Sequence, residues 1–296
     1  MQSILPNAQE LVPNLGVLDK LLSDKVAKNK RARAHRETEQ LVHYLRGACF
    51  ALGQLERHRI IAAEHFVKMH PDDPKARWLM LEDLPDSMSY CADSFLMFLR
   101  RACDAVILYI NRCCEKRDMP RSMNDLVKNI QNWNLDCRIR DALISYWEET
   151  GKKVRDYRDL ASHHAIVLSN CLMFYHFPSG SVALRMLLPD DSSAKSPSQL
   201  RYELGVPAMG FFVDSLFDTV RFVNVVVERL IDLMAPDQPG VRTTRVIQII
   251  PRGGALPLSD ERPKGEPVPY SVRAADVVRR AVRDAGVGQF GAGATD

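Results

Sequence analysis

The sequence predicts a mainly α-helical bundle with two long helices, followed by a small antiparallel β-hairpin or sheet. Apolar residues recur at three- and four-residue steps over most of residues 35–169, which is the spacing of one helix face. Residues 181–188 instead alternate between apolar and polar, as strands do. No apolar run approaches the ~20 residues that a membrane-spanning helix needs. We therefore expect no membrane partner.

The two long helices are predicted at about residues 35–69 and 87–116. A short amphipathic helix at about 15–27 comes before them, and the prolines around residue 71 separate them, since a proline disfavours helix in the residue before it. A short helix is expected at about 75–82. The apolar stripes of the long helices include Leu41, Leu45, Ala48, Leu52 and Leu55 in the first, and Phe95, Leu99, Val106 and Ile110 in the second.

Shorter helices and a change of period follow. Ser122 is a plausible N-cap for the next helix, and another helix, at about 137–149, leads to a stop at Gly151. A helix at about 154–169 comes next, then two strands, 171–177 and 181–188, that form a hairpin. Leu200, Tyr202 and Leu204 alternate in the same way. The last core helix is predicted at about 207–234.

Three regions are expected along the chain. Residues 1–34 form a lead-in, residues 35–235 form the helical domain, and residues 236–296 form an appendage rich in proline, glycine and arginine. Segments of such composition bury little apolar surface, so we expect the appendage to be flexible. It has room for one strand at about 245–250 and one short basic helix at about 271–285.

Composition narrows the classes of function. The 296 residues are 46% hydrophobic and 26% charged, as in globular proteins, and the net charge of +3 is too small by itself to imply nucleic acid. Seven scattered cysteines without a C-x-x-C pair predict reduced thiols in a cytoplasm, not disulfides or a zinc site. Two groups of cations nevertheless cluster in the sequence. Such clusters either bind a phosphate backbone or lie on a solvated helix face. The clusters are Lys28, Lys30, Arg31, Arg33 and Arg36, and Lys152, Lys153 and Arg155.

The run of six residues from Arg158 to His163 carries the clearest chemistry. An arginine can clamp a phosphate with two parallel hydrogen bonds, and a histidine can accept and donate protons near neutral pH. Asp159 lies four residues before His163, on the same helix face, where its carboxylate can orient the imidazole. These are the parts needed to cleave a phosphodiester without a metal. The alternative is an ordinary ladder of Arg155, Asp159 and His163 on a solvated helix face.

The pattern Arg, polar residue, any three residues, His lies after four helices and a Lys-Lys-x-Arg lead, and in this setting it resembles the HEPN superfamily of helical domains. The resemblance covers roughly residues 35–235. It implies a metal-independent endoribonuclease that acts as a toxin or in phage defence, with a cognate antitoxin or regulatory protein as a further partner. Arg158 matches the family arginine, Asp159 the polar position and His163 the histidine, while His164 has no counterpart and leaves open which imidazole faces the cleft.

The resemblance also implies a homodimer whose two motifs face each other across one cleft. Arg158 and His163 are about 140° apart around an ideal helix, so a second copy would complete a clamp. The alternative function is a non-catalytic HEPN-like dimer that binds RNA, a nucleotide or a partner protein.

The predicted site residues follow from these arguments. Arg158, His163 and Asp159 are expected to be catalytic, and Lys152, Lys153 and Arg155 to bind RNA, the substrate that has the required 2′-hydroxyl. No phosphate loop or dinucleotide fingerprint is present, and we expect no cofactor. We also expect no metal, because the histidines at 58, 65 and 70 near Glu64 lack H-E-x-x-H spacing.

Overall fold

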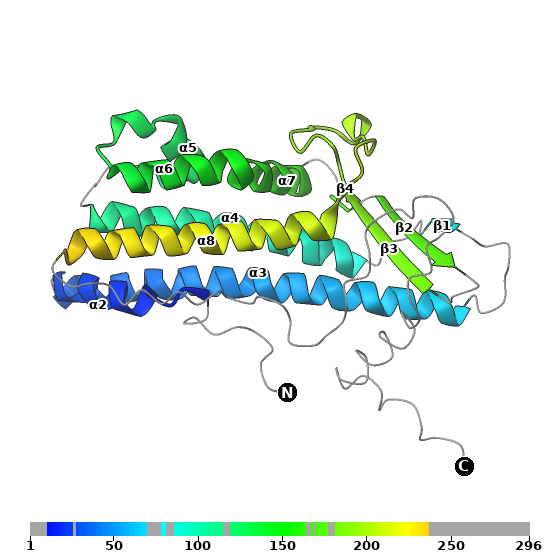
Figure 1. Cartoon of the computed structure of the whole chain (residues 1–296), viewed down its shortest axis with the longest axis horizontal. Helices are drawn as coiled ribbons and strands as arrows, with labels where there is room; N and C mark the ends of the chain where they lie inside the picture. The colour runs from blue at the N-terminus through cyan, green and yellow to red at the C-terminus, as the bar shows by residue number, and fades with distance from the viewer. Residues whose placement is uncertain are drawn as a thin grey trace, which may run out of the picture.

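The computed structural model describes residues 11–25, 28–69, 78–80, 86–114, 119–163, 167–168, 170–176 and 181–236. Helix α3 (Lys28–Met69) forms one layer, and α4 (Asp86–Cys113) and α8 (Ala208–Met234) form the middle layer. Helices α5 (Met123–Lys128), α6 (Cys137–Tyr146) and α7 (Lys152–His163) lie on the other side (Figure 1). The predicted mainly α-helical bundle with two long helices is confirmed.

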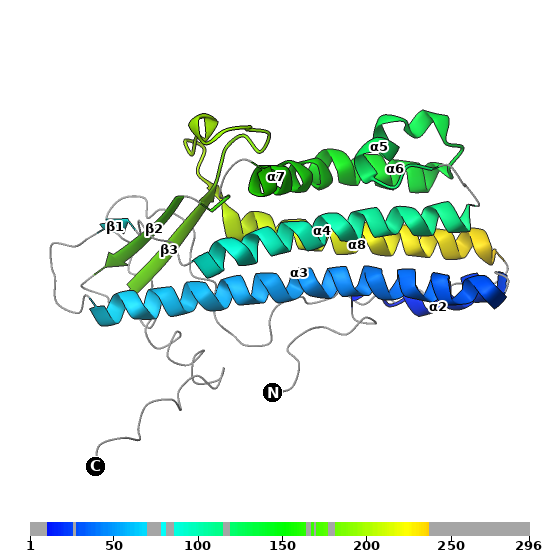
Figure 2. The ribbon, with the colours of Figure 1, turned by 180° about the vertical axis from the view of Figure 1, so that it is seen from behind.

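Helix α2 (Leu15–Lys25) packs against α3 and α8 at one end of the bundle (Figures 1 and 2). Leu15, Leu18 and Leu22 recur at three- and four-residue steps and are buried, so its apolar stripe faces the core. Asp19, at the margin of this stripe, accepts a hydrogen bond from the hydroxyl of Thr38 in α3 (2.9 Å). Part of the segment expected as a lead-in therefore shares the hydrophobic core of the helices that follow it.

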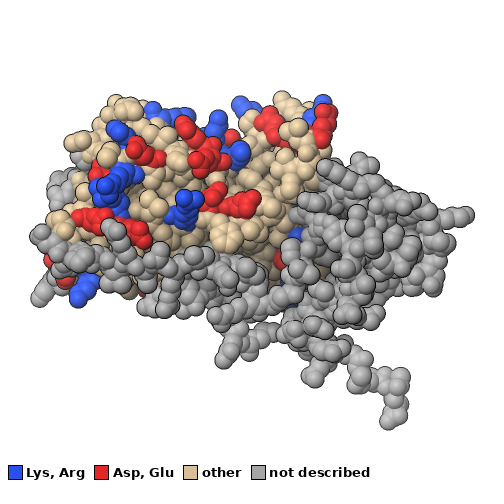
Figure 3. Space-filling view, in the orientation of Figure 1, with Lys and Arg blue, Asp and Glu red and all other residues tan. Residues whose placement is uncertain are grey.

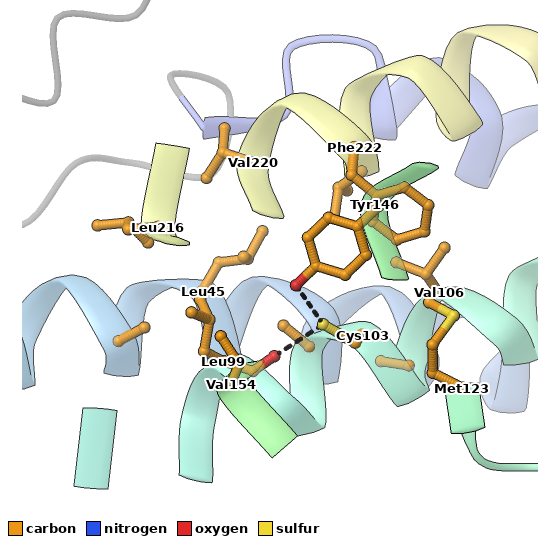
Figure 4. Close-up of a cluster of buried hydrophobic side chains, with 14 of the residues drawn as sticks. Leu45, Leu99, Cys103, Val106, Met123, Tyr146, Val154, Leu216, Val220 and Phe222 are labelled. Carbon is orange, nitrogen blue, oxygen red and sulfur yellow. Dashed lines mark hydrogen bonds between the residues drawn. The ribbon is translucent and has the colours of Figure 1, made fainter. Parts of the chain in front are cut away.

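The centre of the core joins α4, α6 and α8 through one tyrosine (Figure 4). The ring of Tyr146 stacks on Phe222 with 4.4 Å between centroids. Its hydroxyl lies 3.0 Å from Cys103 Sγ and 2.8 Å from Thr219 Oγ1. Burial raises the pKa of Tyr146 well above its ordinary value and the pKa of Cys103 to about 11, so both groups stay neutral. Every polar atom of this buried trio has a partner, as a stable core requires.

Helices α6 and α7 form one continuous rod, joined by a π-helical turn at Trp147–Gly151. The predicted stop at Gly151 is therefore wrong. A Cβ at Gly151 would lie 2.8 Å from Cε1 of Tyr146 and 3.1 Å from Cε3 of Trp147. Glycine is needed here because the aromatic rings of Tyr146 and Trp147, from the preceding turn, approach the backbone. The predicted N-cap of α5 is confirmed, since Ser122 Oγ accepts a hydrogen bond from the backbone N–H of Asp125 (3.2 Å).

A four-stranded antiparallel sheet lies at one end of the bundle (Figure 1), in the order β1 (Trp78–Met80), β2 (Asn170–His176), β3 (Ser181–Leu188) and β4 (Val206–Pro207). The predicted hairpin is confirmed as β2 and β3, with Cys171 opposite Met186. The helix expected at about 75–82 is wrong at residues 78–80, which pair with β2. Residues 200–204 are also no strand: the N–H groups of residues 203 and 204 donate to the carboxylate of Asp190.

Several predicted features lie outside the described residues. They are His164, the strand at 245–250, the helix at 271–285 and nearly all of the appendage expected at 236–296. Within the described ranges, no helix combines the length and apolar character needed to cross a membrane.

Candidate functional site

Helix α7 presents one apolar face to the bundle and its charges to the outside. Val154, Tyr157 and Leu160 are three residues apart, are all buried, and lie on the side of α7 that packs on α4. Lys152 and Lys153 are exposed at the beginning of the helix. The charged residues between these positions lie at the edge of the packed face, where they meet neighbouring elements.

Arg155 makes hydrogen bonds or a cation–π contact with three neighbours. Its Nε donates to Asp156 Oδ1 (2.8 Å), a second nitrogen of the same guanidinium also donates to that oxygen, and Nη1 donates to Asn124 Oδ1 (2.6 Å). The guanidinium carbon also lies 5.5 Å from the ring centroid of Trp147, a cation–π contact. Because Asp156 is only 8% exposed, its carboxylate needs this cation. The guanidinium of Arg155, predicted to bind RNA, is thus engaged within the fold.

Arg158 is paired with its sequence neighbour. Its Nη1 lies 2.9 Å from Asp159 Oδ1, and the other oxygen of Asp159 lies 4.0 Å from Arg155 Nε. Arg158 also acts on Asp104 of α4: burial raises the pKa of Asp104, and the positive charges of Arg100 and Arg158 oppose that rise. The ion pairs of Asp159 therefore join it to two arginines. Its predicted role in orienting the imidazole of His163 stays a prediction.

A hollow of about 310 Å³ opens between the end of α7 and the loop that follows β3. This volume is at the small end of the usual range for ligand pockets, about 300–1,000 Å³. His163 and Asp159 line the hollow, but Arg158 does not. Lys152 and Lys153 also lie outside its wall. The lining residues are Arg155, Asp156, Asp159, Leu160 and His163 of α7, and Ser192, Ser193, Ala194 and Lys195 of the loop.

The loop that closes the hollow is tied at both ends. Tyr157 of α7 donates a hydrogen bond to the carbonyl oxygen of Pro189 (2.7 Å), which fixes the start of the loop to the motif helix. The carboxylate of Asp190 accepts hydrogen bonds from the N–H groups of Glu203 (2.7 Å) and Leu204 (3.1 Å), which closes its far end. In Figure 1 the loop is the yellow-green segment above β4, beside the end of α7. A compact loop closed at its base is an Ω-loop, a type that is frequently functional.

The charges around the hollow differ in how far they are engaged. The carboxylates of Asp156 and Asp159 both have arginine partners. Among the residues that the structure describes, the ammonium group of Lys195 has neither a hydrogen bond nor an ion pair. Lys195 therefore contributes the positive charge in this wall that is available to a bound anion.

On the side of the molecule seen in Figure 3, positive and negative side chains are interspersed. Lys152 and Lys153 are exposed among acidic neighbours such as Glu148 and Glu149. Of the earlier basic cluster, Arg36 is exposed, and the side chains of residues 28–33 lie outside the described residues. An anion on this face would therefore be recognised by individual cations and not by one continuous basic surface.

Comparisons with models of known protein families, with curated proteins and with solved structures found no match. Within the part of the chain that the structure describes, no three His, Cys, Asp or Glu side chains are grouped so that they could hold a metal ion.

Sequence reasoning missed the loop residues of the hollow. Ser192, Ser193 and Lys195 belong to a polar segment that directly follows β3, and Asp191 Oδ1 accepts hydrogen bonds from both the N–H (2.8 Å) and the hydroxyl (2.7 Å) of Ser193. An Asp followed two residues later by Ser is a local signal for such a turn. That signal predicts the turn but not which helix it faces.

Proposed function

We propose that this protein is a metal-independent endoribonuclease of the HEPN type, which cuts RNA by attack of a ribose 2′-hydroxyl. The observation that carries the proposal is the position of His163 on the wall of a hollow that also presents Lys195 and two serine residues. An imidazole that can move a proton beside a cation that can hold a phosphate is the minimum set for this reaction. The resemblance of residues 158–163 to the HEPN motif supports the same chemistry.

The reaction needs no external reagent. The 2′ oxygen bonds to the neighbouring phosphorus while His163 accepts the hydroxyl proton. The bond between phosphorus and the 5′ oxygen breaks, and this oxygen takes up the proton from the imidazolium, directly or through a solvent relay. The products are one RNA with a 2′,3′-cyclic phosphate and one with a 5′-hydroxyl, so atoms and charge balance without water or metal.

Arg158 has a conditional part in this proposal. It is paired with Asp159 at 2.9 Å and does not line the hollow of its own chain. A homodimer that brought two α7 helices together would give each hollow a second Arg158, whose guanidinium would stabilise the charge that grows on the phosphoryl oxygens. The resemblance also supports a role as a toxin or in phage defence, with an antitoxin or regulatory protein as partner.

A second candidate function is binding of RNA or a nucleotide without cleavage. The observation that favours it is the same Arg158–Asp159 pair, because an arginine already bound to a carboxylate is less available to a transition state. This candidate predicts affinity for RNA that falls steeply with salt, and no cleavage products.

Cleavage in the presence of EDTA tests the leading proposal. Purified protein should cut RNA to 2′,3′-cyclic phosphate ends, and a single 2′-deoxy substitution at the cut site should block that cut. His163→Ala should slow cutting by about 100-fold or more, as expected for loss of a general base. His43→Ala, which removes an exposed histidine of α3, is the matched control and should cut at the wild-type rate.

Two results would contradict the assignment. One is cutting that survives the combined loss of Arg158 and His163. The other is cutting of an all-deoxy substrate, which has no 2′-hydroxyl to attack. Circular dichroism and thermal melting of each variant establish that a loss of activity is not a loss of fold.

A further inference from the structure

The loop at residues 190–204 brings a lysine from outside the motif to the hollow that His163 lines. Lys195 and His163 belong to different elements, and both line the same hollow of about 310 Å³. Within the described residues, the ammonium group of Lys195 has no protein partner. A cation in a ligand-sized hollow that is paired with neither carboxylate of the wall can bind an anion from outside.

We infer that residues 190–204 form a phosphate-binding arm, and that Lys195 holds the phosphate on which His163 of the same chain acts. The identity of the ligand as an RNA phosphate rests on the proposed function. The arm brings a cation and an imidazole together within one chain, so this part of the site does not require a second copy of the chain.

The distribution of charge favours Lys195 over the arginines of α7. Arg155 is held by Asp156 and Asn124, and Arg158 is held by Asp159. Moving Arg155 to a phosphate would leave Asp156, which is 8% exposed, without its cation, and that is costly. Moving Arg158 would break its 2.9 Å ion pair with Asp159. Within the described residues, Lys195 breaks no side-chain hydrogen bond or ion pair when it binds an anion.

The arm is built to hold this position. Its start is fixed to α7 by Tyr157, its two ends are closed by Asp190, and Ala194, directly before Lys195, is buried in the core cluster. The backbone N–H of Lys195 donates to Gln199 Oε1 (2.8 Å), which fixes the backbone at the lysine itself. A cation on an anchored backbone stands where a phosphate can be bound with little loss of conformational entropy.

Ser192 adds a neutral hydrogen-bonding group to the same wall. Its hydroxyl has no hydrogen bond among the described residues, whereas the hydroxyl of Ser193 donates to Asp191. A lysine charge and a serine hydroxyl together suit the oxygens of one phosphodiester, which carries a single negative charge.

Binding of an RNA that cannot be cut tests the arm. The probe is a short 2′-O-methyl oligouridylate, whose blocked 2′ oxygen keeps the phosphate chain and removes the nucleophile. Lys195→Ala should raise its Kd about tenfold and reduce the slope of log affinity against log salt by about 0.7, the loss of one phosphate contact to a single strand. Lys195→Arg should keep most of the affinity, because the positive charge stays.

Lys20→Ala is the matched control, because it removes one exposed lysine from α2, at the other end of the bundle (Figure 1). It should leave both the Kd and the salt slope unchanged. An equal loss of affinity in Lys20→Ala and Lys195→Ala would overturn the inference, as would a wild-type protein that does not bind the probe. Thermal melting of Lys195→Ala should match the wild type, since its side chain makes no hydrogen bond or ion pair within the described residues.

The result separates this inference from the proposed function. If wild type binds the probe through Lys195 but leaves natural RNA uncut in EDTA, the arm stands and the nuclease proposal fails. If wild type cuts RNA and Lys195→Ala binds and cuts as well as wild type, the nuclease proposal stands and the arm fails.

Discussion

The rod formed by α6 and α7 handles charge differently at its two ends. At its beginning, Asp136 accepts hydrogen bonds from two N–H groups of α6 and binds Arg229 of α8 through both carboxylate oxygens (3.0 and 3.3 Å). At its far end, His163 lies beside Lys195 of the loop that follows β3, and both residues line an open hollow. Paired charges fix the beginning of the rod to the bundle, whereas the ammonium group of Lys195 has no hydrogen bond or ion pair within the described residues and remains available to a ligand.

In the middle of the rod the charges are also paired, as at the beginning, although Arg155 there lines the hollow. Arg155 lines the hollow, but its guanidinium contacts Asp156, Asn124 and Trp147. The contrast therefore predicts two separate kinds of variant. Changes at His163 and Lys195 should alter binding and catalysis with little effect on stability, and changes along the paired part should alter stability.

The largest loss of activity is expected when the site at the open end is damaged, and mixing two differently damaged chains should not restore it. If Lys195 and His163 of one chain serve the same phosphate, each His163→Ala or Lys195→Ala chain has a damaged site whatever its partner. Equal amounts of the two variants, unfolded together and refolded, should then cut RNA no faster than the separate variants. The measurement is the initial rate of cleavage in EDTA, with refolded wild type as the control.

Sites shared between chains would give the opposite result. In a symmetric dimer, half of the refolded molecules would hold both variants, and each would have one intact site, which restores about a quarter of the wild-type rate. Recovery of that size would mean that the lysine and the imidazole act across an interface. The contrast between the two ends of the rod would remain, but the open end would belong to a dimer.

The joint of the rod should respond next most strongly. Gly151→Ala places a methyl group 2.8 Å from a ring carbon of Tyr146, and overpacking of this kind costs about 1–3 kcal/mol of unfolding free energy. The control is Gly53→Ala in α3, where a Cβ meets nothing within 4 Å. That change should stabilise the helix by about 0.5–1 kcal/mol. Urea unfolding measures both changes, and equal signs for the two would contradict the close approach.

Local sequence patterns were sufficient for most of the helices and for the hairpin. The stripes of α3, α4 and α8 and the alternation of β3 repeat within a few residues, so the sequence predicts them without tertiary information. One error arose where a distant segment decides the outcome, and another where the packing of neighbouring side chains decides it. Residues 78–80 are a strand because β2 offers its edge, and Gly151 continues a helix because aromatic rings pack against it.

The candidate site divides in the same way. The residue types of α7 that suit phosphate chemistry follow from the run that begins at Arg158. The sequence does not show which of these groups are already bound within the fold. Arg155, for example, contacts Asn124 of α5 and Trp147 of the π-helical turn. Lys195 was not predicted because only the folding of the β3 loop onto α7 brings it to His163. Sequence finds chemical groups, but their availability is a tertiary property.

The smallest effect is expected at the beginning of the rod, and it depends on pH. Hydrogen bonding to Arg229 lowers the pKa of Asp136 in the folded protein. A lowered pKa stabilises the fold above the pKa of the unfolded state, about 3.9, and this contribution is lost as the pH falls through the folded value. Asp136→Asn keeps an N-capping side chain but removes the charge, so only the ionic part is lost.

Thermal melting between neutral and acidic pH measures that loss. The Asp136→Asn protein should melt slightly below the wild type at pH 7, and the difference should shrink as the pH falls below about 4, where the wild-type carboxylate also becomes neutral. Cleavage and probe binding should match the wild type at pH 7. If Asp136→Asn impaired RNA cleavage while the rod stayed folded, the paired end would take part in function, and the division of the rod into a structural end and a ligand-binding end would be wrong.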